Sequence, residues 1–115
     1  DEAALKDVIP LFITDLEERI HNLTEHIHSA NYQQIRNEAH TIKGSSFNIG
    51  ARLLGEAAFE VEKAGKVADP GKLVETFRAM KRCFWALLYR LAAEGFIESR
   101  DPEEEDGIIA GGNAS

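Results

Sequence analysis

Four runs of apolar residues, spaced three and four positions apart, constrain the fold of this chain more than any other feature. The runs cover residues 9–28, 31–50, 52–64 and 69–95. Such spacing places apolar side chains along one side of a helix, and nothing alternates with the period of two that a strand requires. Four amphipathic helices with short connections predict an all-α fold, an antiparallel up-down four-helix bundle.

The ends of these runs carry residues that typically start or stop helices. Asn31, with Gln34 three residues later, predicts a capped start for the second helix, and Asp69 predicts an N-cap for the fourth. Gly65 predicts the end of the third helix as a C-cap glycine. The prolines occupy positions at which a helix can begin or end rather than the interior of a run, namely Pro10, Pro70 and Pro102.

The composition changes near residue 100. Residues 101–106 read Asp-Pro-Glu-Glu-Glu-Asp, and a stretch of Gly, Ala, Asn and Ser closes the chain. A segment of this kind cannot bury enough apolar surface to offset the entropy of ordering it. We therefore expect one helical domain, residues 1–99, followed by a disordered acidic and glycine-rich tail, residues 100–115.

The charge of the chain narrows the classes of partner. Its formal net charge is -7 and its pI is near 5.0. Proteins that bind nucleic acids or anionic membranes need a cationic surface, so the composition excludes both classes. We expect protein partners, no nucleic acid, no direct membrane contact and a monomeric domain.

Cysteine content and hydropathy indicate the compartment. Cys83 is the lone cysteine, so no internal disulfide can form, and its apolar setting is typical of a small core residue. The sequence contains no apolar run of about eighteen residues or more and no basic-then-apolar leader. We expect a cytoplasmic domain that is either free-standing or a piece of a longer protein.

The second predicted helix carries a histidine away from its apolar stripe. The stripe is centred near Ile35 and Ile42, and at roughly 100° per residue His40 falls more than about 90° from it, so the imidazole should face solvent. Gly44, one turn later, costs the helix roughly 1 kcal/mol relative to alanine but leaves the ring open to a large partner. Lys43 places an ammonium on the adjacent turn, within reach of a phosphoryl group on the ring.

The residues from His40 onward resemble the signature of histidine phosphotransfer domains, which is His, any residue, an aliphatic, Lys, Gly and then small residues. The matching segment is His40-Thr41-Ile42-Lys43-Gly44-Ser45-Ser46, followed by Ile49-Gly50. The resemblance covers roughly residues 8–95 and extends through the third helix, including Leu54, Val61 and Glu62. It implies a four-helix bundle, a phosphoryl acceptor at His40 and a partner that is the receiver domain of a response regulator or hybrid kinase.

One position departs from the resemblance. Many family members have Gln where this chain has Glu62, and that side chain orients the acceptor imidazole; Glu is more similar to the phosphoacceptor domains of chemotaxis kinases. Glu62 can hold the Nδ1 proton of His40 and leave Nε2 as the nucleophile, or it can be a surface glutamate. Ser45, Phe47 and Lys66 are weaker candidates for phosphate or docking contacts. Phe47 can instead fill a gap between helices, and Lys66 can instead meet the helix dipole.

Other chemistry finds little support in the sequence. The histidines of the first helix lack the spacing of a zinc site, namely His21, His26 and His28. The chain has no Walker-type glycine loop, no dinucleotide fingerprint and no nucleophile elbow, so we expect neither an ATP site nor kinase activity of its own. A parent hybrid histidine kinase remains compatible with this expectation.

The leading functional hypothesis is a phosphorelay intermediate. It takes a phosphoryl group on His40 from a receiver aspartyl phosphate and passes it to a response-regulator aspartate, with no cofactor of its own because the receiver brings Mg²⁺. One alternative is the phosphoacceptor domain of a chemotaxis-type histidine kinase. Another is a non-phosphorylated helical adaptor, which a buried His40 or a Lys43 that points away from it would favour.

Overall fold

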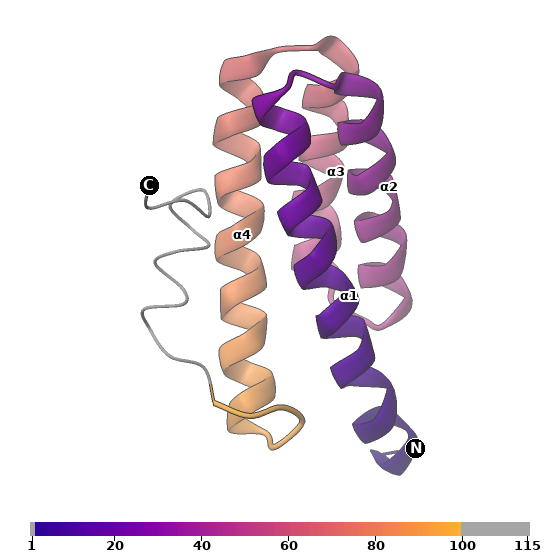
Figure 1. Ribbon diagram of the computed structural model, residues 1–115. Helices are drawn as coiled ribbons and strands as arrows, with labels where there is room; N and C mark the ends of the chain where they lie inside the picture. Colours follow the sequence, from indigo (N-terminus) through magenta and orange to yellow (C-terminus); the bar gives the residue numbers. More distant parts are fainter. Residues whose placement is uncertain (1, 100–115) are drawn as a thin grey trace.

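The protein is an antiparallel four-helix bundle, as predicted from the sequence. A computed structural model describes residues 2–99, and in that part of the chain the helices are α1 (Glu2–His28), α2 (Tyr32–Asn48), α3 (Arg52–Val67) and α4 (Pro70–Ala93). The connections at residues 29–31, 49–51 and 68–69 are too short for a crossover, so successive helices run in opposite directions (Figure 1). The predicted tail, residues 100–115, lies outside the described residues.

The four apolar stripes form a single core. Ser46 of α2 is fully buried, in agreement with its place in the periodic pattern. α4 contributes the bulkiest side chains, and the rings of Phe84 and Trp85 meet edge to face with 6.4 Å between centroids. The largest fully buried side chains are Trp85, Phe84, Ile13, Leu16, Leu23, Ile35, Ile42, Leu54, Leu73, Met80, Leu88 and Val61.

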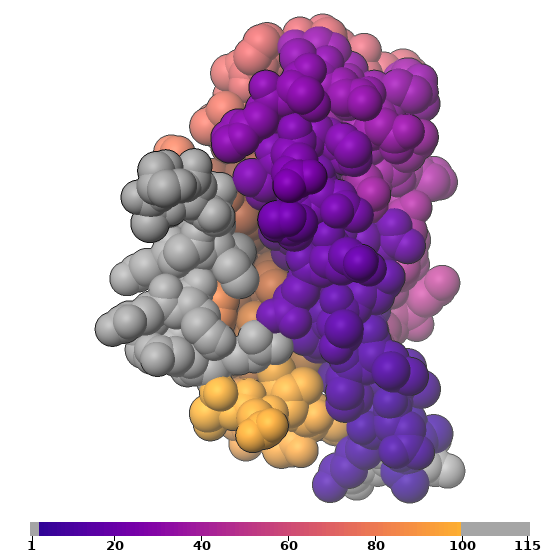
Figure 2. All heavy atoms as spheres, in the orientation of Figure 1, coloured from indigo at the N-terminus to yellow at the C-terminus, as the bar shows by residue number. Residues whose placement is uncertain are grey.

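α1 begins earlier than the sequence predicted. It starts at Glu2, and Pro10 lies inside it, so the prediction that every proline marks a helix boundary was wrong for Pro10. Proline removes one backbone N–H and conflicts with the carbonyl four residues before it, which here belongs to Lys6. Residues 3–8 are exposed, and this part of α1 extends past the α2–α3 connection (Figures 1 and 2).

α3 ends later than predicted, and Gly65 is not its C-cap. The helix continues to Val67, and Ala68 takes the left-handed conformation that caps it, with φ of 55°. Gly65 is buried instead, and a Cβ atom there would lie 3.1 Å from side-chain atoms of Ile35 and Arg36 on α2. The glycine is therefore explained by the close approach of two helices rather than by the end of one.

A second glycine on α3 has the same effect closer to the α2–α3 connection. Gly55 is buried beneath the ring of Phe47, and a Cβ atom there would come within 2.8 Å of that ring. Phe47 thus fills the gap between α2 and α3, one of the two roles considered for it, while 46% of the residue remains exposed. With α2 and α3 this close, polar side chains on their outer faces can meet.

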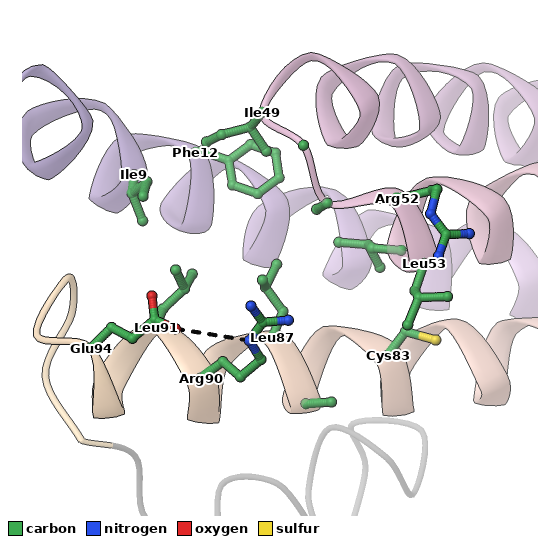
Figure 3. Close-up of a pocket in the computed structure, with 14 residues that line it drawn as sticks. Ile9, Phe12, Ile49, Arg52, Leu53, Cys83, Leu87, Arg90, Leu91 and Glu94 are labelled. Carbon is green, nitrogen blue, oxygen red and sulfur yellow. Dashed lines mark ion pairs between the residues drawn. The ribbon is translucent and has the colours of Figure 1, made fainter. Parts of the chain in front are cut away.

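A cavity lies elsewhere in the bundle, away from these outer faces of α2 and α3. It has a volume of about 480 Å³ and lies between the N-terminal half of α1, the α2–α3 connection and the C-terminal half of α4 (Figure 3). Ile9, Phe12 and Leu87 line it together with Cys83, which is half-buried against the core and whose thiol pKa is raised by burial. No site residue predicted from the sequence lines this cavity. In the part of the chain that the structure describes, no helix has the length and apolar character needed to cross a membrane.

Candidate functional site

The side chain of His40 projects from the middle of α2 and is 67% exposed, as its position off the apolar stripe predicted. Its Nδ1 atom lies 3.0 Å from Oε2 of Glu62, which projects from α3. The two residues are 22 positions apart in the sequence, so the contact exists only because α2 and α3 pack together. The ring is fixed on its Nδ1 side.

Lys43 binds the other oxygen of the same carboxylate. Its Nζ atom lies 2.9 Å from Glu62 Oε1, which makes the two residues an ion pair. The side chains of Lys43 and Glu62 are each only 23% exposed. Glu62 therefore bridges His40 and Lys43, and we call these three residues the His40–Glu62–Lys43 cluster.

The ionisation state of Glu62 decides which nitrogen of His40 carries the proton. Burial acts to raise the pKa of Glu62, but pairing with Lys43 and then with His40 outweighs it, so the pKa lies below its ordinary value. The carboxylate is then ionised at neutral pH and can only accept hydrogen bonds, which assigns the proton to His40 Nδ1. In the neutral imidazole this leaves the Nε2 lone pair available as a nucleophile.

Gly44 leaves open space beside this cluster. It is exposed, and a Cβ atom at this position would have no neighbour within 4 Å. The packing that explains Gly55 and Gly65 is thus absent at Gly44, although a glycine inside a helix costs roughly 1 kcal/mol relative to alanine. Packing against a neighbouring helix therefore does not explain this glycine.

The weaker candidates lie outside the cluster. Ser45 is half-buried, and Lys66 is exposed in the last turn of α3; among the described residues, no hydrogen bond or ion pair joins either of them to His40. On α1, His21 lies 3.4 Å from Glu25 at its Nε2 atom, an exposed pair within one helix. Within residues 2–99, no group of three or more His, Cys, Asp or Glu side chains is arranged to hold a metal ion.

The sequence did not indicate one residue that the structure brings to the cluster. Phe59 of α3 has the Nζ atom of Lys43 4.7 Å from its ring centroid, and the Nζ atom of Lys63 at the same distance. Phe59 stands three residues before Glu62, a spacing that puts both on one face of α3. That spacing was the available signal, but the position of Lys43 over the ring depends on the α2–α3 packing.

Comparison with known protein families identifies a relationship. A protein-family model described as Hpt domain matches residues 7–93. No curated protein and no solved structure matches the chain significantly. The matched range begins within α1, ends at the last residue of α4 and includes every residue of the His40–Glu62–Lys43 cluster.

Proposed function

The chain belongs to the Hpt domain family, and from that premise we propose that His40 is the residue that carries the phosphoryl group. Hpt domains act in histidine phosphotransfer within two-component phosphorelays and interact with receiver domains. In this proposal His40 accepts the group from a receiver aspartyl phosphate and passes it to a response-regulator aspartate. The observation that carries it is an exposed imidazole whose Nδ1 is bound to an ionised carboxylate and whose Nε2 is free.

The transfer step follows from this arrangement. The Nε2 lone pair attacks phosphorus in line, the Nε2–P bond forms, and the bond between phosphorus and the aspartyl oxygen breaks, which releases the aspartate carboxylate. The ring, still protonated at Nδ1, then carries a positive charge beside the Glu62 carboxylate, 3.0 Å away. The same step in reverse delivers the group to the acceptor aspartate.

The neighbours of His40 have complementary roles in the proposal. Lys43 supplies a cation for the phosphoryl oxygens, and Gly44 leaves room for the receiver to reach Nε2. We expect the receiver to bring the Mg²⁺ that neutralises charge on the phosphoryl group, because the chain offers no ATP-binding motif and relies on its partner for the phosphoryl donor. Ser45, Phe47 and Lys66 remain proposed as lesser phosphate or docking contacts. A cytoplasmic, monomeric domain is part of the same proposal.

One alternative keeps His40 as acceptor but changes the donor. The phosphoacceptor domain of a chemotaxis-type kinase would receive the group from an ATP-binding domain, and the Glu62–His40 contact favours it, because glutamate at this position is more similar to that class. The short α1–α2 connection at residues 29–31 favours the phosphorelay intermediate. A buried His40 or a Lys43 that points away from it would have favoured the helical-adaptor hypothesis. His40 is instead 67% exposed, and Lys43 contacts the same carboxylate as His40.

The decisive test is phosphoryl transfer from receivers. The full chain is incubated with phosphorylated receiver domains and Mg²⁺, and the bound phosphate is assayed for the acid lability and base stability of phosphohistidine. We expect labelling of the wild type and of His21→Gln, which alters an exposed histidine far from the cluster in sequence, and none of His40→Gln. Labelling of His40→Gln at the wild-type level would refute the assignment of His40. Labelling by a kinase ATP-binding domain but by no receiver would favour the chemotaxis-type alternative.

A further inference from the structure

Phe59 is an exposed aromatic residue that contacts two lysines. It is 43% exposed on α3, and the ammonium groups of Lys43 and Lys63 each lie 4.7 Å from its ring centroid. Lys63 is on the same helix, four residues later, whereas Lys43 comes from α2. A cation within about 6 Å of a ring centroid is attracted by the electron-rich face of the ring.

The two lysines have different second partners. Lys63 Nζ lies 2.8 Å from Glu60, three residues away on the same exposed surface. Lys43 Nζ lies 2.9 Å from Glu62, which also holds His40. The ring of Phe59 and the carboxylate of Glu62 therefore both hold the ammonium of Lys43, although a lysine side chain is otherwise highly flexible.

We propose that Phe59 is a positioning residue that holds Lys43 in place for phosphoryl transfer at His40. This inference rests on the proposed function of His40. A carboxylate binds an ammonium through a directed contact, which Lys43 must weaken to turn toward a phosphoryl oxygen. The attraction to a ring face is less directional, so Phe59 retains the ammonium near His40 before and after the phosphoryl group arrives.

An exposed phenylalanine near His40 could instead act only by touching the receiver. A small phosphoryl donor separates these roles because it needs no docking surface. Phosphoramidate, which is protonated on its nitrogen at neutral pH, serves this purpose. The Nε2–P bond forms, the N–P bond of the donor breaks, and ammonia leaves with the bonding electron pair and takes up a proton from solvent. If Phe59 acts through Lys43, substitution of Phe59 slows this reaction in the absence of any receiver.

The experiment measures the rate at which phosphoramidate labels His40 in the full chain. Phe59→Leu should lower the rate about two- to fivefold, the effect of losing one exposed cation–ring contact, and Phe59→Tyr should restore it. Leu53→Ala, at a 64% exposed position of the same helix, should leave it unchanged. In a Lys43→Met background, Phe59→Leu should have no further effect, because the cation it positions is gone.

The outcomes separate the inference from the proposed function. A wild type that takes no phosphate on His40 contradicts the proposed function itself. A normally labelled wild type with an unaffected Phe59→Leu variant overturns the inference alone. The inference is also overturned if Phe59→Leu lowers the labelling rate equally in the wild-type and Lys43→Met backgrounds, because Phe59 then acts independently of the lysine. Denaturant unfolding of each variant checks that the bundle is intact.

Discussion

The seam between α2 and α3 differs from the seam between α1 and α4. α2 and α3 make the most extensive helix–helix contact in the described chain, and α1 and α4 make the least extensive one among the helix pairs that touch. Two buried glycines of α3, Gly55 and Gly65, lie at the first seam against side chains of α2, whereas α4 brings large rings, Phe84 and Trp85, to the core. The polar cluster thus forms where small side chains let two backbones approach, and the bulk of the apolar core lies beside it.

Lys43, at the α2–α3 seam, and Lys81, on α4, illustrate the difference between the two regions. Lys43 is half-buried beside Glu62 and Phe59, so its charge is compensated. Lys81 of α4 is only 3% exposed, with its Nζ atom 4.5 Å from the Phe77 ring centroid and no carboxylate within 4.0 Å among the described residues. Burial, and then the charge of Arg78, lowers the pKa of Lys81 to about 8. At the α2–α3 seam, Glu62 compensates the charge of Lys43. On α4, the buried charge of Lys81 has no such partner among the described residues and lowers the stability of the fold.

Truncating the α4 core should have the largest effect on stability. Phe84 is fully buried, so Phe84→Ala should lower the free energy of unfolding by about 3–5 kcal/mol. If the two regions are separable, the fraction that remains folded should still accept phosphate on His40 at the wild-type rate. Denaturant unfolding and labelling under native conditions measure the two quantities. A transfer rate per folded molecule that falls with stability would show that α4 also shapes the cluster.

Removing the buried charge of α4 should stabilise the protein. At neutral pH both the folded and the unfolded chain carry Lys81 protonated, and only the folded chain suffers its desolvation. Lys81→Met should therefore raise the free energy of unfolding by about 1–3 kcal/mol at pH 7. Lys72→Met is the control, because Lys72 is exposed and pairs with the exposed Glu75. It should change the free energy of unfolding by less than about 0.5 kcal/mol.

The pH dependence of stability tests the Lys81→Met prediction independently. The folded-state pKa of Lys81, about 8, lies below its ordinary value of 10.5, so the unfolded chain binds more protons between these limits. Wild-type stability should gain a contribution as pH rises from about 8 to 10.5, and the advantage of Lys81→Met should shrink over that range. An advantage that stays constant with pH would mean that packing, not charge, separates the two proteins.

The sequence predicted the start of a helix correctly where a side chain caps it. Asn31 and Asp69 accept hydrogen bonds from the backbone N–H groups of Gln34 and Lys72, at 3.3 Å and 3.1 Å, which confirms both predicted N-caps. The prediction for Gly65 was wrong because a glycine can either end a helix or allow two helices to approach closely. Only the packing of α2 against α3 distinguishes the two. Pro10, similarly, is accommodated inside α1 in a way that no local rule for proline indicates.

The candidate site was predictable to the extent that it lies within one helix. His40, Lys43 and Gly44 are neighbours on α2 by spacing alone. Glu62 came from the family resemblance, since helical periodicity on α3 gives no distance to α2. Phe59 was missed for the same reason: nothing in the sequence places its ring under Lys43. The functional roles of these residues remain predictions for the experiments described above.

The same substitution to alanine at Gly44 and at Gly65 tests how tightly α2 and α3 are packed. At Gly44 a Cβ atom meets nothing within 4 Å, so Gly44→Ala should raise the free energy of unfolding by about 0.5–1 kcal/mol through helix propensity. At Gly65 the same Cβ lies 3.1 Å from a methyl group of Ile35, which is fully buried and cannot move away. Gly65→Ala should therefore lower stability by about 1 kcal/mol, since overpacking exceeds the propensity gain. Equal shifts at both positions would show that the α2–α3 seam is not tightly packed.

The smallest expected effect concerns the charge of Glu62. Its pKa in the folded chain lies below the ordinary value of 4.5, so its pairing adds stability above that value and the addition is lost as pH falls through the lower, folded-state pKa. The carboxylate is partly exposed, which limits the contribution to about 0.5 kcal/mol. Denaturant unfolding from pH 7 down to pH 3 should show a loss in wild type that Glu62→Gln lacks. Glu56→Gln, which removes an exposed partner of Arg52, is the control and should retain it. If Glu62→Gln follows the wild-type curve, the carboxylate binds His40 and Lys43 too weakly to fix the imidazole, and the tautomer of His40 must be set by other groups.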